Sequence, residues 1–467
     1  MKIHKIALVT LITLLTTIGQ TPINRSAIVG IQEALAQTPQ ARKAQADRLL
    51  RQGNQQYQTS QFEAALQSWQ QALIIYREIK DRKGEGGALG GLGNAYFFLA
   101  EYPKAIEYYS SWLAIAREIK DRKGEGGALG GLGNAYNALG DYKKVIEYQQ
   151  QSLAIAKKIK DRKGEGGALS GLGNAYHALG DYKKAIEYYS ESLTITREIK
   201  ARNGEGGALG GLGNAYNALG DYKKVIEYQQ QSLAIAREIK DRKGEGGALS
   251  GLGNAYNALG DYKKVIEYQQ QSLAIAREIK ARNSESAALS NLGNAYFSLG
   301  DYKKAIEYYS ESLAIAREIK ARNGEGKSLG GLGNAYNALG DYKKVIEYQQ
   351  QSLAIAREIK DRKGEGGALS GLGNAYFSLG DYKKAIEYYS ESLAIAREIK
   401  ARNSESGALG GLGNAYFSLG DYKKAIEYYS ESLAIAREIK DRNGEGKSLG
   451  GLGNAYNALG DYKKVIE

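Results

Sequence analysis

A segment of 40 residues repeats in register through most of this chain of 467 residues. The tripeptide Gly84-Glu85-Gly86 recurs at 124, 164, 204, 244, 324, 364 and 444, and Ser-Glu-Ser replaces it at 284 and 404. These ten starts follow a divergent unit at about 41–83, so the sequence holds about eleven units. A fixed period of this length is typical of a solenoid, in which each unit packs only on its neighbours.

Each unit predicts two helices joined by tight turns. In the unit that begins at 124, one helical face carries residues at spacings of three and four, namely Leu129, Leu132, Tyr136 and Leu139. Gly140 can end this helix in a left-handed conformation, and Asp141 can cap the next one. An apolar stripe marks the second helix from Val145 to Ile159, and residues 160–164 form a polar connection to the next unit.

Residues 1–36 have the features of a secretion signal. A short basic start precedes an apolar stretch from Ile6 to Ile18, which is too short to cross a hydrocarbon core of ~30 Å as a helix. Ala34-Leu35-Ala36 fits a signal-peptidase pattern, so we expect cleavage after Ala36 and a periplasmic or secreted chain. An uncleaved anchor is the alternative. Residues 37–46 are then expected to be a linker, and residues 47–467 the tandem array.

Composition removes most catalytic chemistry from the repeats. The chain has no Cys and two His, of which His4 lies in the signal segment. Thiolate nucleophiles, zinc-thiolate sites and multi-histidine metal sites are therefore excluded from the repeats. The net charge of +12 is spread over many units rather than gathered in a basic block, which argues against nucleic-acid binding. We expect no enzymatic activity, no cofactor and no metal.

The recurring pattern Leu129-x-x-Leu132-Gly133-x-x-Tyr136, followed by Gly140, Tyr142 and Tyr148, resembles the tetratricopeptide repeat. Leu stands in place of the leading Trp, and the closing Pro is absent. Units of 40 residues are similar to those of kinesin light chains and of secreted bacterial arrays. The resemblance implies an all-α fold, a right-handed α-solenoid superhelix of antiparallel helix pairs. It also implies that the first helices line a concave face.

The resemblance places one groove position of each first helix on an asparagine. This row is Asn94, Asn134, Asn174, Asn214, Asn254, Asn294, Asn334, Asn374, Asn414 and Asn454. A side-chain amide has both donors and an acceptor, so such an Asn ladder could bond an extended peptide backbone in either sense. The alternative is that each Asn bonds its own neighbouring helix or is solvated.

Three residues further along, the first helices differ from unit to unit. These predicted groove-specificity residues are Phe97, Asn137, His177, Asn217, Asn257, Phe297, Asn337, Phe377, Phe417 and Asn457. Phe would offer apolar pockets, and Asn or His polar ones. Recombination of two repeat types would produce the same variation without selection for a ligand. Missing side chains at the interior glycines would leave the groove wide and bare.

We expect a non-catalytic scaffold that binds an extended peptide or a protein partner on its concave face, with no membrane contact after signal removal. The chain ends at Glu467, six residues into a predicted helix without a cap. The alternative is therefore the recognition arm of a larger secreted protein. Such arrays resemble the front half of proteins that carry a caspase-like CHAT protease domain, which would lie beyond residue 467. Self-association through the uncapped last repeat is a further expectation. A third alternative is that the repeats were duplicated recently and that the array has no dedicated ligand.

Overall fold

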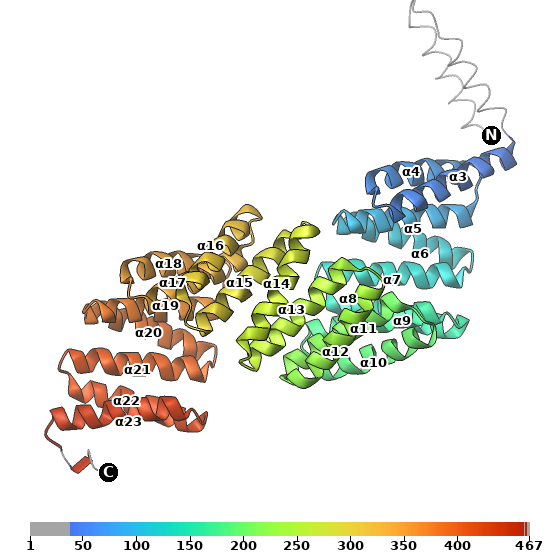
Figure 1. Ribbon diagram of the computed structural model, residues 1–467. Helices are drawn as coiled ribbons and strands as arrows, with labels where there is room; N and C mark the ends of the chain where they lie inside the picture. The colour runs from blue at the N-terminus through green and yellow to red at the C-terminus, as the bar shows by residue number, and fades with distance from the viewer. Residues whose placement is uncertain (1–37, 462, 465–467) are drawn as a thin grey trace, which may run out of the picture. The chain divides into compact units, whose positions relative to one another are not determined.

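The computed structural model describes residues 38–461 and 463–464, and the structural statements below concern these residues. The predicted secretion signal and its cleavage position lie outside them. The described residues form 21 α-helices and no strand, which confirms the all-α solenoid of helix pairs (Figure 1). The chain divides into two compact units, one that ends at Asp181 and one that begins at Tyr182. Each unit is described by itself.

The first unit contains three complete helix pairs and the first helix of a fourth. Its first helices are α3 (Pro39–Gln58), α5 (Arg82–Phe98), α7 (Arg122–Ala138) and α9 (Arg162–Ala178). Its second helices are α4 (Phe62–Glu78), α6 (Tyr102–Glu118) and α8 (Tyr142–Ile159). Residues 39–46, which we expected in a linker, belong to α3. This helix starts early because Thr38 caps it, accepting a hydrogen bond from the N–H of Ala41 at 3.2 Å, and Pro39 suits its first turn.

The second unit begins with α10 (Tyr182–Glu198), a second helix, and continues with six complete pairs and a last first helix. Its first helices are α11 (Arg202–Leu219), α13 (Arg242–Ala258), α15 (Arg282–Ser298), α17 (Arg322–Ala338), α19 (Arg362–Ser378), α21 (Arg402–Ser418) and α23 (Arg442–Ala458). Its second helices are α12 (Tyr222–Glu238), α14 (Tyr262–Glu278), α16 (Tyr302–Glu318), α18 (Tyr342–Glu358), α20 (Tyr382–Glu398) and α22 (Tyr422–Glu438).

The turn between repeats is shorter than the sequence suggested, and the turn within a repeat uses the predicted residues. Within a repeat, Gly140 adopts a φ of 77° and Asp141 caps α8, as predicted. Between repeats, Lys160 takes the left-handed conformation with a φ of 58°, and Asp161 caps α9 by accepting a hydrogen bond from the N–H of Gly164 at 3.0 Å. The predicted connection 160–164 therefore shrinks to two residues, because this cap draws 162–164 into the first turn of the helix.

Leucine and alanine fill the space between the helices. Leu129 and Leu132 are almost fully buried, as their spacing predicted. Leu139, placed on the same face by the sequence, is 49 % exposed, because α7 ends at Ala138 and Leu139 lies in the turn at the edge of the stack. Within each unit the backbones of neighbouring first helices approach one another, whereas those of neighbouring second helices do not, among the described residues. The first helices therefore form the inner side of each stack.

In seven of the described repeats, a buried Tyr or Gln of the second helix is held between glycines of two successive first helices. A β-carbon on Gly293 of α15, or on Gly331 of α17, would lie 2.6 Å from the ring of Tyr309. We call this side chain the wedge residue of its repeat. The wedge residues that lie between two such glycines are Tyr109, Gln149, Gln229, Tyr309, Gln349, Tyr389 and Tyr429. The glycines on either side of these seven wedge residues thus permit an approach that an added β-carbon would obstruct.

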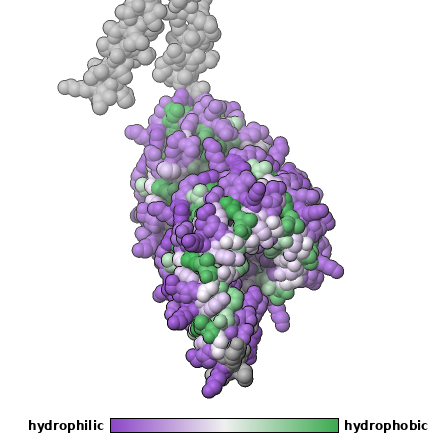
Figure 2. All heavy atoms as spheres, turned by 90° about the vertical axis from the view of Figure 1, so that its left-hand side faces the viewer, coloured by the Kyte–Doolittle hydropathy of each residue, from purple (hydrophilic) through white to green (hydrophobic). Residues whose placement is uncertain are grey.

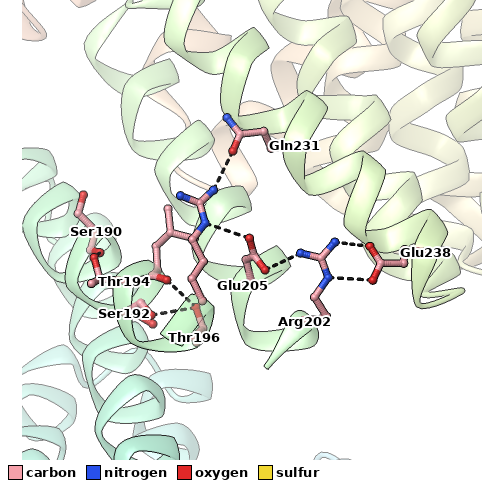
Figure 3. A network of polar contacts seen from close by, with 10 residues as sticks. Ser190, Ser192, Thr194, Thr196, Arg202, Glu205, Gln231 and Glu238 are labelled. Atoms are coloured by element: carbon pink, nitrogen blue, oxygen red, sulfur yellow. Dashed lines mark hydrogen bonds and ion pairs between the residues drawn. The ribbon is translucent and has the colours of Figure 1, made fainter. Parts of the chain in front are cut away.

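An ion-pair network connects the ends of successive helices (Figure 3). Arg197 of α10 donates to Glu205 of α11 at 3.0 Å, and Arg202 donates to the other carboxylate oxygen of Glu205 at 2.7 Å. Arg202 also forms a bidentate pair with Glu238 of α12. Glu205 is 7 % exposed, so the central carboxylate of the Gly-Glu-Gly motif is buried between two guanidinium groups.

None of the helices in the described part of the chain is both long enough and apolar enough to cross a membrane.

The wedge geometry predicts opposite outcomes for one substitution at two sites. Gly331→Ala places a β-carbon 2.6 Å from Tyr309 and should lower the free energy of unfolding by about 1–3 kcal/mol through overpacking. Gly367→Ala meets nothing within 4 Å and should raise it by ~1 kcal/mol through helix propensity. Urea unfolding followed by circular dichroism measures both. Equal effects of the two variants would contradict the wedge.

The buried carboxylates predict a loss of stability in acid. Burial acts to raise the pKa of Glu245, but hydrogen bonds from Arg237 and Arg242 outweigh it, so the pKa lies below the ordinary value of 4.5. A carboxyl with a lowered pKa stabilises the fold above about pH 4.5 and loses this contribution as the pH falls through its folded pKa.

Glu245→Gln should therefore lower the free energy of unfolding at pH 7 by about 1–3 kcal/mol. The difference from the parent chain should shrink towards pH 3. Denaturant unfolding at both pH values checks this. Glu267→Gln is the control, because Glu267 is exposed and lies outside the network. A difference for Glu245→Gln that stays constant with pH would be incompatible with the assigned network.

Candidate functional site

Three hollows among the described residues lie on the inner surface of the first helices. In the first unit, a hollow of about 810 Å³ extends along α5, α7 and the start of α9 and includes Asn94 and Asn134. In the second unit, a hollow of about 700 Å³ includes Asn294 and Asn334, and another of about 360 Å³ includes Asn374 and Asn414. The predicted Asn ladder thus contributes to all three, on the side of each stack where the first helices lie.

Glycines open these hollows. In the first unit, Gly126, Gly127, Gly130 and Gly131 of α7 line the wall, and their missing side chains leave room for the second helix to reach the surface. Gln149, Ser152 and Ile155 of α8 accordingly line the same hollow. The sequence had assigned the groove to the first helices alone. The second-helix residues were missed because they lie on the apolar stripe of their helix. The first helix would cover this stripe if it carried side chains at the positions of its glycines.

The ladder asparagines are exposed, and the wedge residues fix their orientation. All ten Asn side chains are exposed. The Tyr309 hydroxyl donates to Oδ1 of Asn294 at 2.7 Å, and Nε2 of Gln349 donates to Oδ1 of Asn334 at 3.3 Å. The Tyr wedges hold Asn94, Asn294, Asn374 and Asn414 at 2.6–2.7 Å, and the Gln wedges hold Asn134, Asn214, Asn254 and Asn334 at 3.3–3.5 Å.

This orientation changes what the ladder can offer a ligand. Burial raises the pKa of the Tyr389 hydroxyl to about 12, so the hydroxyl stays protonated and donates to Asn374. Because Oδ1 accepts this bond, the Nδ2 amide hydrogens are the groups that the side chain presents to the groove. The anchored amides therefore direct their Nδ2 donors to the groove, while Oδ1 keeps a second lone pair as an acceptor, as Asn254 shows by accepting from both Gln269 and Asn291. Asn174 and Asn454 occupy the same position and are exposed as well.

Of the predicted groove-specificity residues, Phe97, Asn257 and Phe297 line the described hollows. Phe297 lines the larger hollow of the second unit and packs against Tyr302 of its own repeat, with ring centroids 5.4 Å apart. The four Phe side chains of this row are half-buried and make the same contact, with centroids 5.4–5.7 Å apart, at Phe97, Phe297, Phe377 and Phe417. Asn137 and His177 are also half-buried, and the remaining members, Asn217, Asn257, Asn337 and Asn457, are exposed.

The charge and polarity of the hollows are mixed. Lys327 and Lys447 replace glycine in two units and line the two hollows of the second unit, together with Asp361 and Asp441. On the face that Figure 2 shows, hydrophilic residues predominate and hydrophobic ones form small separate patches. In the described part of the chain, no three His, Cys, Asp or Glu side chains gather as a metal site would need. The hollows suit a polar chain with some apolar side chains.

The wedge contacts could have been found in the sequence by comparing equivalent positions in neighbouring repeats. Each wedge follows its ladder Asn by 15 residues, and glycines recur at 93, 131 and the equivalent positions around the Tyr or Gln, with Asn291 as the exception. Two glycines and one bulky polar residue that recur at fixed offsets in three different helices indicate one shared contact. The structure brings them together and adds the ladder Asn as the fourth partner.

Comparison with known proteins agrees with this geometry. The family model described as tetratricopeptide repeat matches residues 87–158, 125–198, 164–238, 204–278, 284–358, 324–398 and 404–467. No curated protein matches the chain.

Among solved structures, the apo quorum sensor NprR from B. thuringiensis aligns with a TM-score of 0.58 at 15 % identity, covering 77 % of this chain and 99 % of that one. A Rap protein in complex with Competence and Sporulation Factor aligns with a TM-score of 0.51 at 16 % identity, covering 76 % and 99 %. A kinesin light chain from Podospora anserina with nearly identical repeats aligns at 22 % identity and a TM-score of 0.36, covering 41 % and 95 %. With the family model matching most of its length, this chain belongs to the tetratricopeptide repeat family.

Proposed function

We propose that this protein is a non-catalytic interaction scaffold that holds an extended peptide segment of a partner along the inner side of its first helices. The observation that carries the proposal is the anchored Asn ladder, whose carbonyl oxygens are bonded to the wedge residues. The Nδ2 groups that remain are matched by the carbonyl oxygens of an extended backbone, which recur at every residue and do not depend on sequence. Anchoring in advance also lowers the entropy that binding would otherwise cost.

The groove-specificity residues would add selectivity to this backbone recognition. In the larger hollow of the second unit, Phe297 gives an apolar contact, whereas Asn257 gives a polar one. A ligand that lies along the groove of the second unit would therefore meet both kinds of surface in turn. Two structures of the same fold supply supporting context, since the Rap protein was solved with Competence and Sporulation Factor and NprR is a quorum sensor.

Removing part of the ladder should weaken this binding without unfolding the chain. We expect the full chain to select peptides from a display library of random 15-residue sequences. The triple variant Asn294→Ala, Asn334→Ala and Asn374→Ala should bind a selected peptide at least tenfold more weakly. Three hydrogen bonds of about 1 kcal/mol each would account for a larger loss still. Fluorescence anisotropy with the labelled peptide measures the affinity.

A matched control distinguishes direct contact of the asparagines with the peptide from an indirect effect of the asparagines on the fold. Tyr309→Phe and Tyr389→Phe remove the bonds that anchor Asn294 and Asn374 but keep both amides in the groove. This double variant should lose much less affinity than the Asn→Ala variant, because its donors remain available. Undiminished affinity in the Asn→Ala variant would exclude the ladder as the binding site. Equal losses in both variants would show that the asparagines act only through the fold.

We also propose that residues 1–36 direct export, on the basis of their basic start, apolar stretch and Ala-x-Ala site. Expression of the full chain in a Gram-negative host should give a periplasmic product whose intact mass corresponds to a chain that begins at Gln37. Deletion of residues 2–36 should retain the protein in the cytoplasm. A product in the membrane fraction that keeps residues 1–36 would favour the uncleaved anchor instead.

A further inference from the structure

Two of the hollows are built from equivalent positions of the repeats. The hollow of the first unit includes Asn94 and Asn134, and the larger hollow of the second unit includes Asn294 and Asn334, 200 residues later. We call them hollow A and hollow B. Most of their other lining residues also correspond in this register, and many are identical. The chain thus contains two versions of one groove surface, and the positions at which they differ show what each is suited to bind.

Hollow A contains three aromatic side chains where the register of hollow B has polar residues. They are Tyr57, Phe98 and Trp112, which correspond to Asn257, Ser298 and Ser312. Hollow A also keeps charged side chains, at Lys83, Asp121 and Lys123. It therefore combines apolar rings with polar groups, as a surface needs to do when it binds apolar side chains and a polar backbone together.

Trp112 is the residue of hollow A that departs most from the other repeats. The eight repeats that follow have serine at this position, from Ser152 to Ser432. The ring lies against glycines of two successive first helices, since β-carbons on Gly86, Gly90 and Gly127 would come within 2.7–3.2 Å of it. It is half-buried and lines the hollow. The glycines thus hold the indole ring in place and leave part of it exposed.

The tryptophan of hollow A and the lysine of hollow B exclude one another. A β-carbon on Gly127 would lie 2.7 Å from Trp112, so a lysine does not fit there without moving the ring. In the second unit, Ser312 is small and fully buried, and Lys327 lines hollow B at the position of Gly127. One version of the groove therefore presents an indole ring, and the other presents an ammonium group.

Phe98 is 57 % exposed, although it is a large apolar side chain. Its ring stacks on Phe62 and meets the edge of Tyr57, both with ring centroids 5.4 Å apart. Later first helices have alanine or serine at this position, from Ala138 to Ala458. Packing of the repeats therefore does not require the ring, and exposed apolar surface bordered by polar groups is typical of a binding site.

We propose that hollow A binds a segment of the ligand with large apolar side chains, which pack on Trp112 and Phe98 while Asn94 and Asn134 bond its backbone. The inference rests on the proposed function and names the part of the peptide that the first unit selects. Transfer of an apolar side chain from water onto these rings is favourable, and an aromatic one adds ring contacts. Hollow B, with Ser298 in place of a ring, should not share this preference.

Selection from the display library, prepared without Trp codons, tests the preference. Peptides selected on the full chain should be enriched in Leu, Ile, Phe and Tyr. The double variant Phe98→Ser and Trp112→Ser should bind them at least tenfold more weakly, because burial of one large apolar side chain is worth about this factor. Later repeats carry serine at both positions, so the circular dichroism spectrum should not change.

The control variant Ile74→Ala and Leu139→Ala removes exposed apolar side chains of the first unit that do not line hollow A, and it should keep full affinity. Selected peptides without apolar enrichment, or equal affinity in the serine variant, would overturn this inference and leave the scaffold function standing. A chain that selects no peptide at all would overturn both.

Tryptophan fluorescence gives a readout that needs no substitution. The chain has two Trp, of which Trp69 is 1 % exposed, so acrylamide should quench mainly Trp112. A saturating selected peptide should shift the emission to shorter wavelength and reduce this quenching. Binding without any protection of Trp112 would contradict the proposal. Protection that rises with protein concentration alone would assign hollow A to a second copy of the chain, and protection by oleate but by no peptide would assign it to a lipid. Either result overturns the proposal.

Discussion

The close approach of a wedge residue to two glycines determines the rest of the structure. Tyr309 lies against Gly293 and Gly331, so three helices from two repeats meet at one side chain. The contact needs the absence of β-carbons, which weakens each first helix by ~1 kcal/mol for every interior glycine relative to alanine. Tertiary packing has to restore that loss, and the same glycines allow the packing. The first helices are therefore helical because of their neighbours, as expected when stability comes from interfaces between units.

The wedge also links packing to the groove. Its polar end reaches the inner surface and bonds the ladder Asn, as Tyr309 does with Asn294. Gln349 and Asn334 form the equivalent pair at 3.3 Å. Tyr and Gln thus serve the same two purposes, filling the space between glycines and orienting an amide, and repeats of either type can follow one another. This explains how two repeat types alternate along the chain without a change in the spacing of the helices.

Some neighbouring repeats are coupled more specifically. Ser286 and Ser312 share hydrogen bonds in the buried space of one repeat, and Ser328 of the next repeat donates to Ser312 at 2.9 Å. The same cluster recurs at Ser406, Ser432 and Ser448. Both repeats that begin with Ser-Glu-Ser are followed by one that begins with Gly-Glu-Gly-Lys-Ser. The pairing of these two variants has a physical basis, since each buried hydroxyl satisfies another.

Local rules predicted what depends on local geometry, and little else. The period, the two helices, the left-handed Gly140 and the Asp141 cap all follow from neighbouring residues. Gln149 was not predicted to be buried, because its place between Gly133 and Gly171 depends on a helix from the next repeat. Leu139 was placed by spacing on the same helical face as Leu129 and Leu132 but is exposed, because spacing does not tell that α7 ends at Ala138.

The Asn ladder also shows what local sequence rules cannot predict. Its ten positions came from a resemblance, and their exposure agrees with it. The direction of each amide could not be predicted, because it depends on the hydroxyl or amide of a residue 15 positions later.

One repeat shows how variation is absorbed without loss of the inner surface. At the position of Gly331, the repeat that begins at 284 has Asn291 instead of glycine. The wedge residue there, Gln269, is fully buried, and Asn291 Nδ2 donates to Oδ1 of the ladder residue Asn254 at 3.2 Å. The added side chain joins the polar row and lines the hollow beside Asn294. A change at the most constrained position is thus tolerated because the new group bonds the ladder and projects into the groove rather than into the stack. Such a position can alter what the groove presents, and it lets a chain of nearly identical repeats differ in its inner surface from repeat to repeat.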